Sequence, residues 1–547
     1  MAGSVLKEQR KLKRALSRGQ LIWLGVGGSI GSGWLFGVLY SVKMAGPAAV
    51  LAWLLGAIML FFIAIVYAEL GAMLPEAGAV VRYPEYTHGS VVGFLMSVIT
   101  LIGYSTIPSI ESEAVVEYLG PKTLFQPSGV PNLEGWLVEA AFIVIFFFIN
   151  FYGVRIFARA NTYVTIAKVL IPIVSIVALA SVFHIGNFTA AAGNGFAPYG
   201  FQGIFVAIAS AGIAFSLVGF RQVIDFSAEA AHPKKDIVPA IIIAFSMATL
   251  IYIGLQAVWI GALPSHVMDH GWAAVKYAAP FVNVAQLAHM KWLVALLVVA
   301  AIISPLGSGT VYFGSAVRAI VGLANNGYVS KKFGHVDEKS GIPKAATWFT
   351  LGMALLWTGP FPIWSLLVSF ASSALLLTYV VGPVSAVVLR HVAPDLPRPL
   401  KLKGLPILAL IAFMVSVNLV YWTGWDAVRV LLGILFVALI IFATVQMRSE
   451  ASRQKFGFAL RKGIWLMVLF AFMLLISYLG SFGGIGVLKY PWDSIIVSLG
   501  AIGFFFWGVA SGFLSDSFVE KLKMLGYPSE QLSDEELHRQ SSQGENV

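Results

Sequence analysis

Residues 27–33, which read GGSIGSG, interrupt the first long apolar stretch of the chain with glycine and serine. Glycine has no side chain and wide backbone freedom, so such a run lets a membrane helix open. The amide and carbonyl groups that an opened helix leaves unpaired must face a cavity or a ligand, as they do in secondary transporters. Glycine and serine also let two helices pack closely, and the run by itself fits both interpretations equally well.

Two cations, Lys168 and Arg221, fall inside apolar segments that are long enough to cross a bilayer. A charged side chain at that depth is costly and marks a functional site by default. A guanidinium stays charged and binds a carboxylate through two parallel hydrogen bonds, so Arg221 indicates an acidic ligand. An ammonium gives up its proton more readily when it is buried, so Lys168 is a candidate for proton exchange.

The residues present do not support other kinds of chemistry. The chain has no cysteine, which excludes disulfides, thiolate metal sites and cysteine nucleophiles. It contains no complete dinucleotide-binding or P-loop glycine motif, no His-Glu-x-x-His motif and no clustered histidines. We therefore expect neither an enzyme nor a site for a cofactor or a metal.

The elements that position these residues are membrane helices. Of the 547 residues, 58% are hydrophobic and 11% are charged, whereas soluble chains average roughly 25% charged residues. Apolar stretches of about 20 residues recur along the chain, as a bilayer requires. A basic segment before residue 20 leads into an apolar stretch too long for a signal-peptide core, so we expect this stretch to be retained as the first helix.

We predict fourteen transmembrane segments with both termini in the cytoplasm. With the N-terminus and every second loop inside, the cytoplasmic side carries 28 of the 36 Lys and Arg residues, and the opposite side carries six. The net charge of +10 then belongs to the membrane rim near anionic lipid rather than to a nucleic-acid surface. The segments lie near residues 20–43, 47–74, 90–118, 136–153, 162–184, 200–227, 237–262, 285–322, 344–360, 363–390, 406–424, 426–447, 464–482 and 491–514.

Four motifs follow one another along these segments. They are Gly31-Ser32-Gly33 with residues 67–71 (YAELG) and Pro75; residues 215–219 (FSLVG) followed by Glu229 and Pro233; residues 324–327 (ANNG) with 341–343 (GIP); and Asn161 followed seven residues later by Lys168. In this order they resemble the amino acid–polyamine–organocation (APC) superfamily over roughly residues 20–390. Residues 34–36 (WLF) and the two final helices make the chain most similar to the bacterial aspartate:proton symporter branch.

The resemblance implies an all-α membrane protein with a LeuT-like five-plus-five inverted repeat, in which helices 1 and 6 break beside each other. Backbone amides at the first break would bind a substrate carboxylate. Carbonyls at the second break would accept the α-ammonium, with Phe215 as a gate. The substrate-binding residues predicted in this way are Ile30, Gly31, Ser32, Gly33, Phe215, Ser216, Gly219 and Arg221.

Arg221 stands where many relatives carry an acidic or neutral residue, which favours an acidic substrate such as aspartate or glutamate. The alternative is that Arg221 pairs inside the protein with Glu111, Glu113 or Asp225. Positions 111 and 113 cannot share one helix face, so we expect at most one of these carboxylates to face the transport pathway.

Lys168 matches the lysine that takes the place of a coupling sodium ion in sodium-independent relatives. We assign proton coupling to Lys168, with Glu111 as a second proton site. The alternative for Lys168 is a permanently charged lysine that hydrogen-bonds carbonyl groups of the first helix.

The predicted function is proton-coupled symport of an acidic amino acid across the plasma or inner membrane into the cell. We divide the chain into a basic cytoplasmic tail (1–19), a ten-helix core (20–390), four additional helices (406–514) and a polar cytoplasmic tail (515–547). The alternatives are an amino acid exchanger and a permease for neutral amino acids, with a channel or receptor as a rival class. The partners expected are the amino acid, protons and lipid, and the oligomeric state is left open.

Overall fold

The computed structural model describes residues 14–152, 154–190, 194–338, 340–360 and 363–524. Within these ranges the chain is helical, with no β-strand and two isolated β-bridges. The predicted tails lie largely outside the described residues. The α-helices are α2 (Arg18–Ser29), α3 (Gly33–Ala45), α4 (Ala49–Met73), α5 (Ala79–Leu119), α6 (Leu133–Phe151), α7 (Val154–Ala180), α8 (Gly200–Ser210), α9 (Ile213–Leu217), α10 (Phe220–Asp225), α11 (Pro233–Gly261), α12 (Pro280–Leu287), α13 (Lys291–Asn325), α14 (Lys344–Trp357), α15 (Trp364–Leu377), α16 (Val381–Val392), α17 (Leu405–Trp422), α18 (Trp425–Gln446), α19 (Glu450–Leu479), α20 (Trp492–Ser511) and α21 (Asp516–Met524).

Eleven helical stretches among the described residues are long and apolar enough to cross a membrane. The stretch Gly33–Met73 counts once, although the short 3-10 turn η1 (Gly46–Ala48) separates α3 from α4 within it. The predicted segments 20–43, 200–227 and 344–360 fall on shorter helices, namely α2 with α3, α8 to α10, and α14. The all-helical membrane architecture is therefore confirmed, whereas the count of fourteen spans stays a prediction.

Two of the predicted segments are interrupted in the middle of the molecule. The first opens between α2 and α3, where Ile30 leaves the helical conformation with φ −87° and ψ 82°. The other opens between α8 and the short α9, where Gly212 adopts φ +91°. A Cβ is strained at such a φ, so the position favours glycine. The first opening lies within the predicted run 27–33, and the second begins a few residues before the predicted 215–219.

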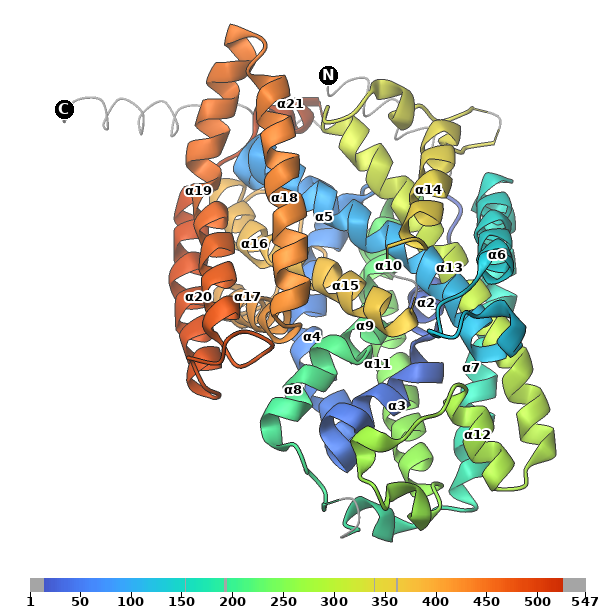
Figure 1. Ribbon diagram of the computed structural model, residues 1–547. Coiled ribbons are helices and arrows are strands. Elements are labelled where there is room, and N and C mark those ends of the chain that lie inside the picture. The colour runs from blue at the N-terminus through green and yellow to red at the C-terminus, as the bar shows by residue number, and fades with distance from the viewer. Residues whose placement is uncertain (1–13, 153, 191–193, 339, 361–362, 525–547) are drawn as a thin grey trace.

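Figure 1 shows how the other helices surround these two openings. The interrupted helices α2, α3, α9 and α10 lie in the middle of the molecule, and the long helix α5 runs across it. Helices α6 and α7 stand on one side, and α18, α19 and α20 stand on the other. Helix α17 packs against α4, α16 and α20 and so joins the C-terminal group of helices to the centre.

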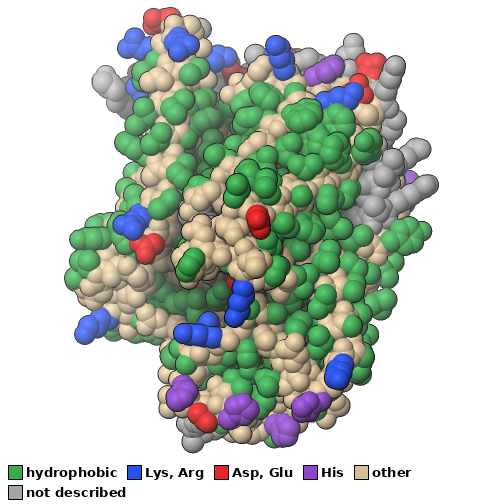
Figure 2. Space-filling model, turned by 45° about the vertical axis from the view of Figure 1, so that its right-hand side comes forward, with side chains coloured by type: hydrophobic (Ala, Val, Ile, Leu, Met, Phe, Trp, Pro, Cys, Tyr) green, Lys and Arg blue, Asp and Glu red, His purple; other side chains and the backbone are tan. Residues whose placement is uncertain are grey.

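The outer surface of the helices is apolar. Figure 2 shows a face on which hydrophobic side chains predominate and charged side chains are sparse. Large apolar side chains stand out from several helices, for example Leu250 on α11 (72% exposed), Phe436 on α18 (66%) and Leu499 on α20 (64%). Apolar surface of this extent is suited to lipid rather than to water, so the protein is an integral membrane protein.

Candidate functional site

The opening of the first helix frees carbonyl groups that side chains from other helices satisfy. The Gly27 carbonyl would accept from the Gly31 amide in a continuous helix, but that amide donates to the Ser29 carbonyl at 3.2 Å. Lys168 Nζ on α7 donates to the Gly27 carbonyl instead, at 2.7 Å. The Tyr252 hydroxyl on α11 donates to the Ser29 carbonyl, also at 2.7 Å. Buried helix ends need such partners, because an unpaired backbone group costs free energy away from water.

The amide group expected to bind a substrate carboxylate is bound by a carboxylate of the chain itself. The Ser32 amide donates to Glu111 Oε2 on α5 at 2.8 Å. Glu111 also interacts electrostatically with Lys168, and both side chains are fully buried. The Ile30 and Gly31 amides donate to carbonyls within the first segment. A substrate carboxylate would therefore have to displace Glu111 to reach the Ser32 amide.

Glycines bring the two openings into direct contact. A Cβ on Gly33 would collide with the Ser216 hydroxyl, and a Cβ on Gly219 would collide with the Ser29 amide. A Cβ on Gly31 would collide with side chains of α5 and α13. The predicted residues of the first and sixth segments therefore lie against each other, and a larger residue at these positions would separate the two helices.

The residues predicted to bind the ammonium and to gate the site lie on and beside α9. Phe215 is buried, with 5% of its surface exposed. The amide and hydroxyl of Ser216 both donate to the Gly212 carbonyl, at 2.9 and 2.7 Å. Residues 215–217 are thus held in a single helical turn between two interruptions, and their predicted roles stay predictions.

Arg221 is completely buried near the start of α10. Its Nη2 donates to the Thr100 hydroxyl at 3.1 Å, its Nη1 donates to the Thr378 hydroxyl, and its Nε has no partner. The rings of Tyr104 and Tyr379 face the guanidinium, with centroids 4.6 and 5.3 Å from Cζ. The guanidinium is therefore held by hydroxyl groups and aromatic rings, which leave part of its hydrogen-bonding capacity free.

None of the internal acids considered for Arg221 forms an ion pair with it. Among the described residues, no carboxylate oxygen lies within 4.0 Å of its guanidinium nitrogens. Asp225 interacts with Arg221 electrostatically, but its carboxylate accepts a hydrogen bond from the Tyr104 hydroxyl. Glu111 is bound to the first helix, and neither oxygen of Glu113 has a hydrogen-bond partner.

Trp364, which the sequence reasoning missed, contacts both openings from the start of α15. Its indole N–H donates to Ser32 Oγ at 2.9 Å, and its ring would lie 3.4 Å from a Cβ on Gly212. The rings of Phe36 and Tyr40 on α3 stack against it, with centroids at 4.8 and 5.5 Å. A tryptophan at the start of an apolar segment looks like a membrane-interface anchor in sequence, so no local signal identified this role. Trp364 closes the site on the side of α3.

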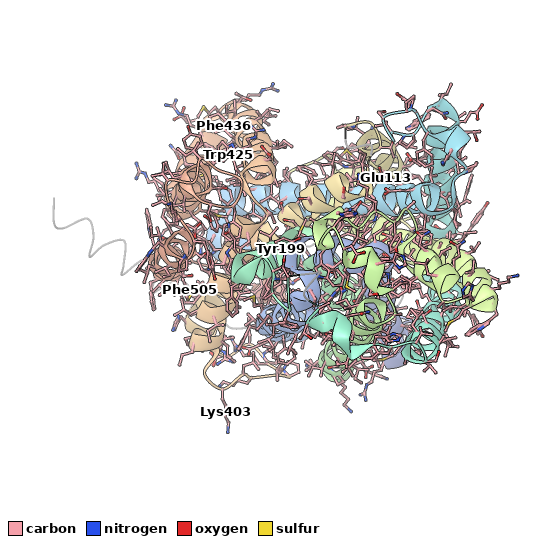
Figure 3. The ribbon with its side chains drawn as sticks, turned by 60° about the horizontal axis from the view of Figure 1, so that its bottom comes forward. Glu113, Tyr199, Lys403, Trp425, Phe436 and Phe505 are labelled. Atoms are coloured by element: carbon pink, nitrogen blue, oxygen red, sulfur yellow. The ribbon has the colours of Figure 1, made fainter. Side chains whose placement is uncertain are left out.

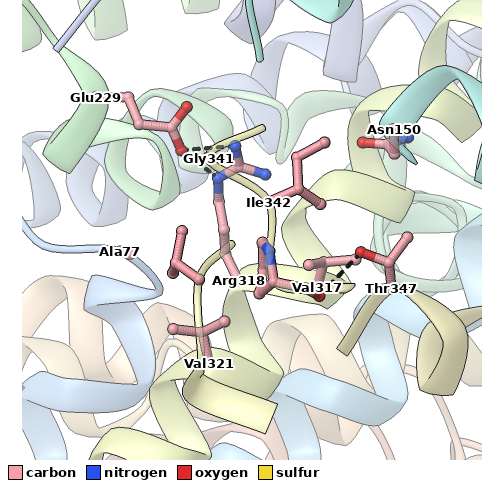
Figure 4. Close-up of a pocket in the computed structure, with 11 residues that line it drawn as sticks. Ala77, Asn150, Glu229, Val317, Arg318, Val321, Gly341, Ile342 and Thr347 are labelled. Carbon is pink, nitrogen blue, oxygen red and sulfur yellow. Dashed lines mark hydrogen bonds and ion pairs between the residues drawn. The ribbon is translucent and has the colours of Figure 1, made fainter. Parts of the chain in front are cut away.

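Contacts at the opposite end of the first segment close the site a second time. The Ala15 and Leu16 amides donate to the Glu229 carbonyl at 3.0 and 2.9 Å. The Glu229 carboxylate forms an ion pair with Arg318 on α13 at 2.6 Å, beside the pocket drawn in Figure 4. That pocket has a volume of about 30 Å³, enough for one or two water molecules but not for an amino acid. The contacts of Trp364 and of Glu229 thus lie at opposite ends of the first segment.

The C-terminal helix α21 docks beside this second closure. Lys521 on α21 forms an ion pair with Glu76, and Arg82 approaches the same carboxylate at 3.3 Å. Burial alone would raise the pKa of Glu76, but the charges of Lys521 and Arg82 outweigh burial and hold the pKa at about 2. The Ser227 hydroxyl donates to the Glu76 carbonyl at 3.3 Å, which links this ion pair to the end of the sixth segment.

Comparison with known proteins identifies the family. The family model described as amino acid permease matches residues 16–423. An aspartate-proton symporter of Bacillus subtilis (strain 168) is 36% identical over 93% of this chain and 98% of the relative. The glutamate/serine transporter AimA of the same organism is 34% identical over 92% of this chain and 95% of the relative, and its branched-chain amino acid permease BcaP is 26% identical over 79% and 93%. The chain therefore belongs to the amino acid permease family of the APC superfamily, whose members are transporters rather than enzymes.

Proposed function

We propose that this protein imports an acidic amino acid together with a proton. The observation that carries the proposal is Arg221, a fully buried guanidinium with no carboxylate within ion-pair distance in the described part of the chain. A buried charge without an ionic partner is costly, and a ligand carboxylate bound through two hydrogen bonds offsets that cost. The relatives support the proposal, because the names of two of them include aspartate or glutamate.

The proposed architecture has fourteen transmembrane helices. Ten of them form a core of two inverted repeats, about residues 20–184 and 200–390, and four more follow within 406–514. The interrupted first and sixth segments and the uneven distribution of Lys and Arg support this arrangement. Both termini then face the cytoplasm, and the protein resides in the plasma or inner membrane.

The substrate binds through three groups in this proposal. Its α-carboxylate takes the place of Glu111 at the Ser32 amide, where the N-terminus of α3 adds a favourable partial charge. Its side-chain carboxylate binds Arg221, and carbonyl groups of residues 215–219 accept its ammonium. Phe215 covers the bound amino acid. Contact between the two openings, through Gly33 and Ser216, supports one site shared by both helices.

Lys168 and Glu111 carry the proton in this proposal. They are fully buried, of opposite charge and interact electrostatically, so a change at one of them alters the protonation of the other. When the substrate displaces Glu111 from Ser32, the released carboxylate loses its amide donor, and a proton from outside stabilises it. Substrate and proton leave together after the contacts at Glu229 open.

Uptake into proteoliposomes tests the proposal. Labelled aspartate should accumulate when the outside is more acidic than the lumen, and removal of sodium should not change the rate. Unlabelled glutamate and aspartate should compete better than asparagine. Aspartate uptake that ignores the pH gradient would overturn proton coupling, and stimulation by preloaded amino acid without a gradient would identify an exchanger instead.

A permease for neutral amino acids is the second candidate. It is favoured by the relative AimA, whose name includes serine as well as glutamate. Serine that competes as strongly as aspartate in the same assay would support this candidate and would remove Arg221 from substrate recognition.

A further inference from the structure

Three carboxylates on the neighbouring helices α5 and α6, which we call the carboxylate trio, interact electrostatically with one another. They are Glu113 and Glu117 on α5 and Glu139 on α6. Glu113 and Glu139 are 4% and 2% exposed, while Glu117 is half-buried. Figure 3 shows Glu113 among packed helices, away from the lipid-facing Phe436 on α18. Two of the three carboxylates are thus withdrawn from water.

No cation balances the carboxylate trio within the part of the chain that the structure describes. None of its members forms an ion pair there, and both oxygens of Glu113 and one oxygen of Glu139 lack a hydrogen-bond partner. Glu113 interacts electrostatically with Glu139 and Glu117, and Glu139 interacts with Glu117. Like charges at such sites repel, and an unpaired buried carboxylate costs several kcal/mol when it is ionised. The closed arrangement is therefore favourable when Glu113 and Glu139 each hold a proton.

The carboxylate trio is connected to Trp364, which covers the first opening and which we call the lid. The Trp364 amide donates to Glu117 Oε2 at 3.4 Å, and the Trp364 indole donates to Ser32 Oγ at 2.9 Å. Ser32 in turn binds Glu111 through its amide. One side chain, Trp364, thus spans the distance between the carboxylate trio and the first opening.

We infer that the carboxylate trio is a proton-binding latch that keeps Trp364 closed over the substrate site while Glu113 and Glu139 are protonated. The inference rests on the proposed proton-coupled uptake and adds a proton site that regulates it from the side of Trp364. Ionisation of Glu113 or Glu139 repels Glu117 and draws water between α5, α6 and α15, which releases Trp364. Acidic conditions outside then favour closure of the loaded site.

The groups around the carboxylate trio do not supply the missing positive charge. Tyr40 on α3 interacts with Glu117 and Glu113, and Lys43 lies 5.5 Å from the Tyr40 ring centroid rather than at a carboxylate. Helix α15 contains no ionisable residue. On the other described helices packed against α5 and α6, Lys168 of α7 and Arg221 of α10 included, no lysine, arginine or histidine side chain interacts electrostatically with the three acids. Among the described side chains, the negative charge of this cluster is therefore left without a cation.

Thiol labelling in intact cells tests the latch, because the chain has no cysteine of its own. In a Ser32→Cys variant, the thiol lies under Trp364 and reacts with a membrane-impermeant reagent only when the lid opens. Labelling should slow at least about tenfold on external acidification. A tenfold change corresponds to about 1.4 kcal/mol of added stability of the closed state. Rates are normalised to Ser265→Cys, an exposed position after α11, to remove the intrinsic pH dependence of thiol reactivity.

Glu113→Gln and Glu139→Gln mimic the protonated side chains and should make labelling slow at every external pH. Glu134→Gln, an exposed position on α6, is the matched control and should keep the parent's pH response. Thermal unfolding in detergent shows that each variant is folded. Retention of the pH-dependent labelling profile of Ser32→Cys in both Gln variants, with unchanged unfolding temperatures, overturns the latch but leaves proton-coupled uptake standing. Absence of aspartate uptake by the protein with Ser32 in place overturns the proposed function itself.

Discussion

Replacement of Arg221 by lysine tests whether its guanidinium binds the side-chain carboxylate of the substrate. The variant keeps a positive charge but loses the planar pair of N–H groups that holds a carboxylate at two points. In the structure, two of the five N–H groups have partners, at Thr100 and Thr378, and Nε is free. Nε and the unused N–H groups of Nη1 and Nη2 are therefore the donors left for a substrate carboxylate.

The size of the effect follows from the number of hydrogen bonds lost. One hydrogen bond to a charged group contributes about 1.5–3 kcal/mol. At about 1.4 kcal/mol for each factor of ten, the inhibition constant of aspartate should rise roughly 10- to 150-fold in Arg221→Lys. Asparagine has nearly the same shape but no side-chain charge, so its inhibition constant should change by less than about threefold.

Competition against labelled aspartate in proteoliposomes measures both constants. Arg390→Lys is the matched control, because Arg390 is a partly buried arginine that pairs with Glu69 at 2.7 Å, away from the two openings. This control should change both constants by the same factor. If aspartate and asparagine weaken in parallel in Arg221→Lys, or if aspartate binding is unchanged, Arg221 does not recognise the substrate side chain.

Three further predictions concern proton coupling, the contact between the openings and the C-terminal helix. Lys168→Ala removes the donor to the Gly27 carbonyl and should make aspartate uptake independent of the pH gradient while counterflow persists; a normal gradient response contradicts the assignment. Gly33→Ala places a Cβ against the Ser216 hydroxyl and should destabilise the protein by about 1–3 kcal/mol in thermal unfolding, with partial rescue by Ser216→Ala. The pKa of Glu76, ordinarily 4.5, is about 2 in the folded protein, so its stabilising effect is present above pH 4.5 and is lost as the pH falls toward 2. This effect amounts to about 3 kcal/mol. Proteolysis of α21 should therefore become faster as the pH falls, whereas in Glu76→Gln, which lacks the ion pair with Lys521, it should be fast at every pH.

Local sequence predicted the parts of the site that depend on helix propensity and on membrane depth. The run 27–33 permits an opening because glycine and serine weaken the helix there, and the resemblance to the APC superfamily favoured an opening over close packing; the structure opens at Ile30. A lysine deep in an apolar segment needs an oxygen partner, and Lys168 binds a carbonyl that this opening frees. In the sixth segment the structure opens at Gly212, a few residues before the predicted motif at 215–219. The left-handed φ at this position favours glycine, and the motif used for the prediction does not include Gly212.

Contacts between distant segments could not be predicted in the same way. Trp364 binds Ser32 across 332 positions of the chain, and nothing local to either residue indicates the pairing. The spacing of Glu111 and Glu113 does predict that they face different ways, and the structure agrees, with Glu111 at the first helix and Glu113 near Glu139. Which acid faces the pathway depends on how α5 is rotated against α6, and that rotation is set by tertiary packing.

The closed structure satisfies its opened first helix with its own side chains, and this bears on selectivity. Lys168 and Tyr252 occupy two freed carbonyls, and Glu111 occupies the Ser32 amide. In the proposed binding mode, a substrate gains at this position only the difference in free energy between binding its carboxylate and binding that of Glu111, which is small because the two groups are chemically alike. A neutral amino acid would gain little beyond this exchange. An acidic one would gain in addition two hydrogen bonds to Arg221, so under this proposal discrimination between the two classes resides almost entirely in that guanidinium.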